Sequence, residues 1–158
     1  MNEKDLSIVI VNNNAKNYLK NSVESIIKNL TGVRYEIIVI DNASVDGSAA
    51  MMRQFFPQAK TISAPRNLGF ARANNLGIKE ATGKYILLLN NDMVVIDGAI
   101  NKLLEFINSN SKIGIATGKL IEENGKVQRN CRSFPITPFD AIFGRASQIG
   151  RASCRERV

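Results

Sequence analysis

The chain contains no histidine and no tryptophan, and it has only two cysteines, Cys131 and Cys154. Without histidine, metal sites built on imidazole and histidine general bases are excluded within these 158 residues. Two cysteines make neither a disulfide framework nor a four-ligand zinc site, and they are typical of a reducing compartment.

Long apolar runs are also missing. No run approaches the roughly 20 residues that span a bilayer. The N-terminal segment MNEKDLSIVIV lacks the apolar length and the small-residue cleavage site of a signal peptide. The expected location is therefore the cytoplasm. Hydrophobic residues make up 44% of the chain and charged residues 22%, which is ordinary for a soluble globular protein of one domain or part of one.

The net charge of +7 comes from basic residues that are scattered, with no block of five or six. No nucleic-acid-binding motif accompanies the charge, so we predict a solvated basic surface and no nucleic-acid partner. The alternative, a basic module that docks on nucleic acid or membrane, requires basic residues gathered on one face.

The last ten residues, 149–158 (IGRASCRERV), have no apolar periodicity and resemble the translation of a common sequencing-adapter oligonucleotide. We predict a non-native tail there; the alternative is a genuine disordered basic tail. On this prediction the domain spans residues 1–148, the native reading frame is cut near Gln148, and the chain is an N-terminal fragment.

Apolar, β-branched runs alternate along the chain with segments of helical spacing. The predicted strands span residues 6–11, 35–40, 60–63 and 84–89. The predicted helices run from residue 16 to a stop at Gly32, over 51–56, from 67 to 82 with Gly83 as its cap, and onward from the N-cap Asp97. Two further strands, 113–121 and 127–132, enclose Asn124-Gly125, a strong hairpin signal. The pattern predicts a doubly wound α/β fold with a mostly parallel sheet and a terminal hairpin.

Polar clusters follow three of the predicted strands: Asn12–Asn14, Asp41–Ser44 and Asn90–Asp92. The carboxyl ends of parallel strands share one edge of the sheet, where ligands bind in open α/β folds. Because residues 86–89 are apolar on both faces, we expect this strand to be central and covered by helices on each side. A carboxylate at its end suits Mg²⁺ or Mn²⁺, with substrate phosphates completing the coordination shell.

The two common phosphate-binding motifs, G-x-G-x-x-G and G-x-x-x-x-G-K-[ST], are absent from the sequence. Gly69, at the start of a predicted helix, could bring backbone N–H groups to an anion. Structural alternatives remain for the polar residues, since Asp41, Asn67 and Asp92 could each serve as a turn or helix-cap residue.

Three stretches together resemble the family-2 glycosyltransferases, which have the Rossmann-like GT-A fold. They are SIVIVNNN (7–14), YEIIVIDNASVDGS (35–48) and RNLGFARANNLGIKEATGKYILLLNNDMVV (66–95). The resemblance covers about residues 6–135. It implies an inverting glycosyltransferase of hexosyl- or rhamnosyltransferase type, which moves a sugar from a nucleoside-diphosphate donor to a saccharide or lipid-linked acceptor in bacterial cell-envelope polysaccharide synthesis.

The resemblance also implies roles for residues at matching positions. Asn12 and Asp41 would contact the nucleotide base and ribose, and Asn91 would lie beside the sugar. Asn67, Gly69 and Asn74 would line the nucleotide pocket. Asp92 would coordinate a divalent metal, Mg²⁺ or Mn²⁺, on the diphosphate.

Two departures from the family pattern are present. Asn13 stands where an aromatic residue is common, and Asn90-Asn91 stand where two acids are often found, so metal binding depends on Asp92 alone. None of the carboxylates after the metal motif's helix and before the tail, at Glu122, Glu123 and Asp140, lies in a motif for the catalytic base. We therefore expect the catalytic base beyond Gln148. We expect this chain to bind nucleotide without turnover. Membrane association, at the inner face, is expected only for the intact protein.

Two other functions remain open. A nucleotidyltransferase shares the α/β architecture, but it would require a Gly-rich activating loop with a basic residue after the first strand, where three asparagines stand. A non-catalytic nucleotide-binding α/β domain is the other alternative.

Overall fold

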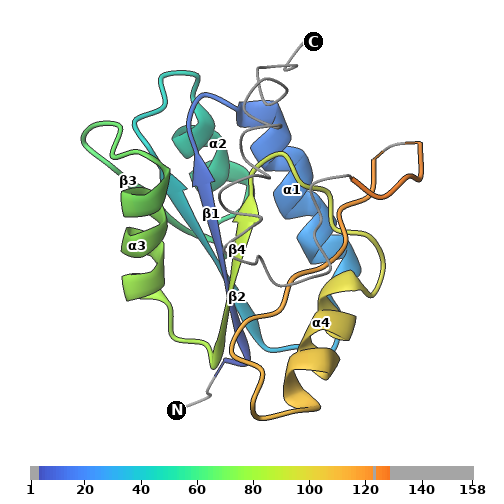
Figure 1. Cartoon of the computed structure of the whole chain (residues 1–158). Helices are drawn as coiled ribbons and strands as arrows, with labels where there is room; N and C mark the ends of the chain where they lie inside the picture. The colour runs from blue at the N-terminus through green and yellow to red at the C-terminus, as the bar shows by residue number, and fades with distance from the viewer. Residues whose placement is uncertain (1–3, 123, 129–158) are drawn as a thin grey trace, which may run out of the picture. The chain divides into compact units, whose positions relative to one another are not determined.

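The computed structural model describes residues 4–122 and 124–128, which belong to two units, one up to Ala116 and one from Thr117 onward. Strands and helices alternate through the first unit (Figure 1). Its elements are β1 (Leu6–Asn12), α1 (Lys16–Asn29), β2 (Tyr35–Asp41), α2 (Ser48–Phe55), β3 (Lys60–Ser63), α3 (Phe70–Glu80), β4 (Tyr85–Asn90) and α4 (Ala99–Asn108). Within the described ranges, no helix has both the length and the apolar character needed to cross a membrane.

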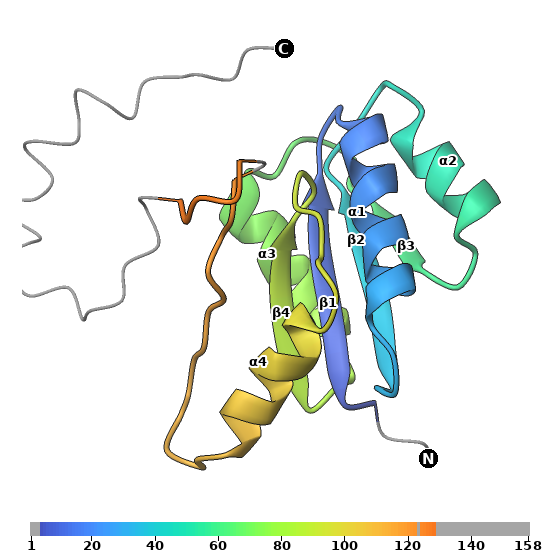
Figure 2. The same ribbon diagram turned by 90° about the vertical axis from the view of Figure 1, so that its right-hand side faces the viewer.

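The four strands form one parallel sheet in the order β3-β2-β1-β4. Helices α1, α2 and α4 pack on one face and α3 packs on the other (Figures 1 and 2). Side chains of β1 alternate between the two layers: Ile8 and Ile10 join the core under α1, and Val9 joins the core under α3. The predicted doubly wound α/β fold is confirmed.

The strand β4 does not have the place that its apolar sequence predicts. Among the described strands it lies at the end of the sheet, and α3 covers β1 and β2 instead. Leu87 and Leu89 pack on the core, but Ile86 is 43% and Leu88 48% exposed. The prediction of a central strand buried on both faces is therefore wrong for the described sheet. The apolar content of a strand does not specify which other strands lie next to it in the sheet.

Helix α3 approaches the sheet closely at Gly77, where a Cβ atom would overlap the side chain of Val9. The prediction that Gly83 caps this helix is wrong, since α3 ends at Glu80 with Ala81 as its C-cap. Gly83 serves a different purpose: a Cβ there would lie 2.6 Å from backbone atoms of the neighbouring β1. Glycine is needed at this position for close approach, which the sequence pattern does not distinguish from a cap.

The N-terminus of α4 also differs from the prediction. Asp97 does not cap the helix, because Gly98, at φ 68°, is the N-cap and no side chain bonds there. The glycine adopts a left-handed conformation that favours glycine and orients the turn into α4.

The second unit contains a tight turn. Ile121 and Val127 form an isolated antiparallel bridge, and Glu122 N donates to Lys126 O at 2.9 Å. The turn predicted at Asn124-Gly125 is confirmed. The prediction of a strand over 113–121 is wrong, because within this range only Ile121 takes part in a bridge. The described residues provide no continuous partner strand for the rest of the range. The strand predicted over 127–132 lies outside the described residues except for 127 and 128. The non-native tail predicted over 149–158 lies wholly outside them.

Candidate functional site

The polar loops after β1, β2 and β4 meet at one edge of the sheet. Asn12 lies opposite Asp41 in the strand register, and Asn42 N donates to Asn12 O at 2.7 Å. Asn91, after β4, donates its side-chain amide to Asn12 Oδ1 at 2.8 Å. The prediction that the three polar clusters share the carboxyl-end edge of the sheet is confirmed.

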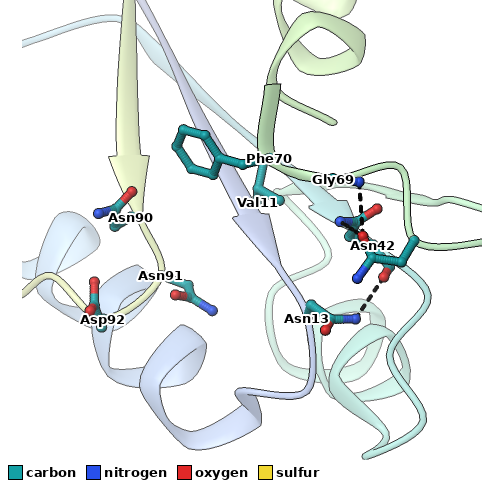
Figure 3. A pocket seen from close by; sticks show the side chains of 9 residues that line it. Val11, Asn13, Asn42, Gly69, Phe70, Asn90, Asn91 and Asp92 are labelled. Carbon is teal, nitrogen blue, oxygen red and sulfur yellow. Dashed lines mark hydrogen bonds between the residues drawn. The ribbon is translucent and has the colours of Figure 1, made fainter. Parts of the chain in front are cut away.

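An open pocket of about 460 Å³ lies at this edge (Figure 3). Its volume falls in the range of sites for small ligands. The lining residues come from β1 and the loop after it, the loop after β2, the loop before α3, the start of α3, and β4 with the loop that follows it. They are Val11, Asn13, Asn42, Asn67, Gly69, Phe70, Asn90, Asn91 and Asp92.

Four of the residues predicted from the sequence line this pocket: Asn67, Gly69, Asn91 and Asp92. The three others, Asn12, Asp41 and Asn74, are buried beside it and are at most 5% exposed. The structure thus gathers the predicted residues in one region, in a lining group and a buried group. Their individual roles toward a ligand stay predictions.

Several lining residues were not among the predicted site residues. Asn42 follows Asp41 in the second polar cluster, and this adjacency was the available signal for it. Phe70 is 65% exposed and projects from the first turn of α3 beside the pocket (Figure 3). The sequence held no clear signal for Phe70, because an aromatic residue in the first turn of a helix can equally well pack into a core.

Asn42 holds the loop before α3 against the end of β2. Its Nδ2 donates to Asn67 Oδ1 at 2.9 Å, and its Oδ1 accepts from Leu68 N at 2.7 Å. Asn67 Oδ1 also accepts from Gly69 N at 2.8 Å. Gly69 has φ 75°, and no side chain caps α3, so the first backbone N–H groups of this helix have no side-chain partner.

Two residues in the pocket-edge loops carry backbone strain. Asn14 has φ 53° and Ala43 has φ 62°, and these are the non-glycine residues with positive φ in the described part of the chain. Asn14 offsets part of the cost, because its Oδ1 accepts from Val45 N at 2.8 Å. Strained backbone of this kind concentrates at binding and catalytic sites.

Asp41 has a carboxylate oxygen that lacks a partner. The residue is 3% exposed, and Oδ1 is buried with no hydrogen bond from any described residue. Among the described residues, the other oxygen accepts one long bond, of 3.4 Å, from Ser44 N. A buried acceptor without a donor is costly, so Oδ1 lowers the stability of the free protein.

Asp46, in the loop after β2, has a structural role. Its carboxylate accepts from Lys16 N at 2.9 Å and from the backbone and hydroxyl of Ser48, so it serves the first turns of both α1 and α2. Burial raises the pKa of Asp46, but the hydrogen bonds from Ser48 and from the backbone N–H groups of Lys16 and Asp46 together outweigh burial and hold that pKa below its usual value.

Asp92 is the carboxylate among the lining residues, and it is exposed to solvent. The described part of the chain contains no group of three or more His, Cys, Asp or Glu side chains that could hold a metal alone. One carboxylate with amide oxygens beside it, at Asn90 and Asn91, fits Mg²⁺ or Mn²⁺ that takes most of its ligands from phosphate and water. It does not fit a metal held by the protein alone.

An open parallel α/β sheet with a polar pocket at the carboxyl ends of its strands is the architecture of nucleotide-binding α/β domains. Residues 7–148, most of the chain, match the model of glycosyl transferase family 2, and the chain belongs to this family.

Similar proteins agree with this assignment. A glycosyltransferase of Rickettsia bellii is 31% identical over 136 residues, which cover 84% of this chain and 19% of that protein. The minor teichoic acid biosynthesis protein GgaB of Bacillus subtilis is 30% identical over 116 residues, covering 68% of this chain and 13% of that protein. The chain thus spans less than a fifth of the length of these two relatives.

The crystal structure of Staphylococcus aureus TarS shares the fold. It superposes with a TM-score of 0.60 at 19% sequence identity, covering 66% of this chain and 20% of TarS. The predicted GT-A type of α/β fold is confirmed by this similarity.

Proposed function

We propose that this chain carries the donor-binding part of an inverting glycosyltransferase. The enzyme would move a sugar, of hexosyl or rhamnosyl type, from a nucleoside-diphosphate donor to a saccharide or lipid-linked acceptor of the cell envelope. The observation that supports this most is the meeting of Asp92, Asn91 and the unpartnered oxygen of Asp41 at one sheet edge. The name of GgaB, a relative assigned to teichoic acid biosynthesis, supports an envelope polymer as product.

The nucleoside would bind on the β2 side of the pocket. There Asp41 would accept from a ribose hydroxyl or a base N–H, with Asn12 supporting the site from its buried position. Asn67 and Gly69 would line the pocket beside the nucleotide. Asn74 donates to Phe70 O at 2.9 Å and would maintain the first turn of α3.

The diphosphate would lie between the start of α3 and the end of β4. Backbone N–H groups at a helix N-terminus favour anions, and those of α3 have no side-chain cap. Asp92, with the amide oxygens of Asn90 and Asn91, would hold Mg²⁺ or Mn²⁺ on the phosphates. When bound, such a metal neutralises the charge that develops on the departing diphosphate. Asn91 would lie beside the sugar.

Sugar transfer also needs a base that deprotonates the acceptor hydroxyl. Besides Asp92, no carboxylate in the described part of the chain lines the pocket. The base would therefore come from outside the described residues. The intact protein would work in the cytoplasm at the inner face of the membrane, without a nucleic-acid partner.

Isothermal titration calorimetry tests the proposal. The chain is titrated with UDP, dTDP and GDP, each with and without Mn²⁺, and with the corresponding triphosphates. We expect Mn²⁺-dependent binding of at least one diphosphate. Tighter binding of a triphosphate would favour a nucleotidyltransferase instead. Binding that does not depend on metal, or no binding of any nucleotide, would contradict the proposal.

A further inference from the structure

The side chain of Asn12 is fully buried behind the pocket, and its amide is engaged within the protein. Its relative exposure is 0%, and it is not among the lining residues. The Oδ1 atom accepts from Asn91 Nδ2 at 2.8 Å, and the Nδ2 atom donates to Ser44 Oγ at 3.2 Å. A direct contact with a ligand would require breaking these bonds and leaving buried polar atoms unpaired, which is costly.

The bonds of Asn12 join the three loops at the sheet edge. Ser44 Oγ also accepts from Asn14 N at 3.0 Å, and Ser44 N donates to Asp41 Oδ2 at 3.4 Å. Asp41, at the end of β2, and the loop that follows it are thereby linked through Asn12 to the loop after β4, which contains Asn91. Buried polar networks of this kind, when satisfied, make a site rigid.

The loop after β4 is attached to the rest of the unit at two places. Near its end, Val95 N donates to Ser25 Oγ at 2.9 Å, and Val95 O accepts from Asn29 Nδ2 at 2.7 Å, both on α1. Near its start, Asn91 is held by Asn12. Asp92 lies between these two attachments, so the Asn12 bond determines how firmly the pocket side of the loop is held.

We infer that Asn12 is a positioning residue, which orients the Asn91 amide beside Asp92 and acts on the donor only through Asn91. This inference rests on the proposed function for its effect on binding. The orientation of Asn91 can be measured without any ligand, and the two parts are therefore tested separately.

The first measurement is NMR of the side-chain amides in the ¹⁵N-labelled chain. In Asn12→Leu, which keeps the volume but removes the acceptor, the order parameter of the Asn91 side-chain NH₂ should fall to below about 0.6, the range of mobile groups. The matched control is Asn42→Leu, since Asn42 is an equally buried amide in the same region but bonds the loop before α3. That control should leave Asn91 as ordered as in the wild type.

A second variant covers the case in which Asn12→Leu does not fold. Asn12→Ser is small and polar, and its hydroxyl is too short to reach the Asn91 amide, so it should release Asn91 in the same way. An Asn91 side chain that stays ordered in the folded Asn12 variants would overturn the inference.

The second measurement is a double-mutant cycle on donor binding, with Mn²⁺ and UDP-glucose, UDP-N-acetylglucosamine, dTDP-rhamnose and GDP-mannose as probes. Asn12→Leu and Asn91→Ala should each weaken binding about tenfold, the effect of losing one buried hydrogen bond. The double variant should bind no more weakly than Asn91→Ala, because Asn12 acts through Asn91.

Losses that multiply in the double variant would overturn the inference, because Asn12 would then act independently of Asn91. If the wild type binds none of the probes, the proposed function and the donor effect of Asn12 are both contradicted. The NMR result then decides by itself whether Asn12 orients Asn91.

Discussion

On the proposed function, Asp41 is a side chain that is placed for a ligand at the expense of stability. Its Oδ1 atom is buried without a hydrogen bond from the described residues, whereas every oxygen of the nearby Asp46 has a partner. The unpaired oxygen lowers the stability of the free protein. Natural proteins retain such a cost where the residue serves binding, because a ligand then supplies the missing donor. On the proposed function, the contrast between Asp41, at the end of β2, and Asp46, in the loop that follows, separates a binding role from a structural one.

The substitution Asp41→Leu should therefore separate stability from binding. Replacing a poorly paired buried carboxylate with an apolar side chain of similar size should leave the free energy of unfolding unchanged within about 1 kcal/mol, or raise it. Nucleoside-diphosphate affinity should fall at least about tenfold, since a hydrogen bond to a charged group is lost. Thermal unfolding and calorimetric titration measure the two quantities.

The matched control is Asp46→Leu, in the loop after β2. It removes the bonds to the first turns of α1 and α2 and should cost about 1–2 kcal/mol of stability, while affinity in the folded protein stays near the wild-type value. An Asp41→Leu variant that loses stability but keeps its affinity would show that Asp41 is a structural residue.

At the residue scale, the sequence predicted the lining positions better than the buried ones. Asn67, Gly69, Asn91 and Asp92 follow strands or open a helix, and their chain positions place them at the sheet edge. The network of Asn12 could not be predicted in the same way. An amide side chain can donate or accept in several directions, so its partners depend on loop conformations that residue spacing does not specify.

At the scale of elements, Glu36 joins two strands and a turn at the sheet edge away from the pocket. Its carboxylate accepts from Lys4 Nζ at 2.8 Å, from Ser7 Oγ at 2.6 Å, and from the backbone and hydroxyl of Thr82, both at 2.8 Å. Burial raises the pKa of Glu36, but the hydrogen bonds from Lys4, Ser7 and Thr82 outweigh it and lower the pKa to about 2. The turn that leads from α3 into β4 is held in this way.

Stability should consequently depend on pH through Glu36. The pKa of its carboxyl is about 2 in the folded chain against an ordinary 4.5. The stabilisation by Glu36 is therefore complete above pH 4.5 and is lost as pH falls toward 2. The unfolding free energy should decrease by roughly 1–3 kcal/mol over this window because of Glu36. Denaturant unfolding at a series of pH values measures the change.

The variant Glu36→Gln should lack this part of the pH dependence and should be less stable at neutral pH by about 1–3 kcal/mol. Glu80→Gln is the matched control, because Glu80 pairs with Lys60 at 2.6 Å but both side chains are 40% exposed or more. It should change stability by less than about 1 kcal/mol. Equal pH profiles for the wild type and Glu36→Gln would contradict this account.

Elements were predicted from the sequence more reliably than their ends and neighbours. The alternation of β-branched runs and helical spacing predicted all eight elements of the first unit, since burial on sheet and helix faces imposes those periods. It did not place β4 at the end of the described sheet, nor identify Gly83 as a point of close approach. Both depend on contacts between segments far apart in sequence, which periodicity within one segment does not report.

For the molecule as a whole, the described pocket contains residues suited to a donor but no second carboxylate that could serve as a base. We therefore expect residues 1–158 to bind a nucleotide sugar without transferring the sugar. The test incubates the chain with radiolabelled nucleotide sugars, Mn²⁺ and a membrane fraction that supplies lipid-linked acceptors, with an active family-2 enzyme as positive control.

Sugar transfer by residues 1–158 alone would contradict this expectation. A chain that ends at Gln148 is the matched variant for the last ten residues. If these residues are a non-native tail, their removal should leave the melting temperature and the nucleotide affinity unchanged.

The central claim concerns Asp92 and a divalent metal on the diphosphate. The most direct measurement compares the affinity for UDP, dTDP and GDP with and without Mn²⁺ in the wild type, in Asp92→Asn and in Asp97→Asn. Asp97 is also exposed and lies five residues further on, but it does not line the pocket. We predict that Mn²⁺ strengthens binding at least about tenfold in the wild type and in Asp97→Asn, and that Asp92→Asn abolishes this gain while keeping the metal-free affinity. A full Mn²⁺ effect in Asp92→Asn would contradict the claim.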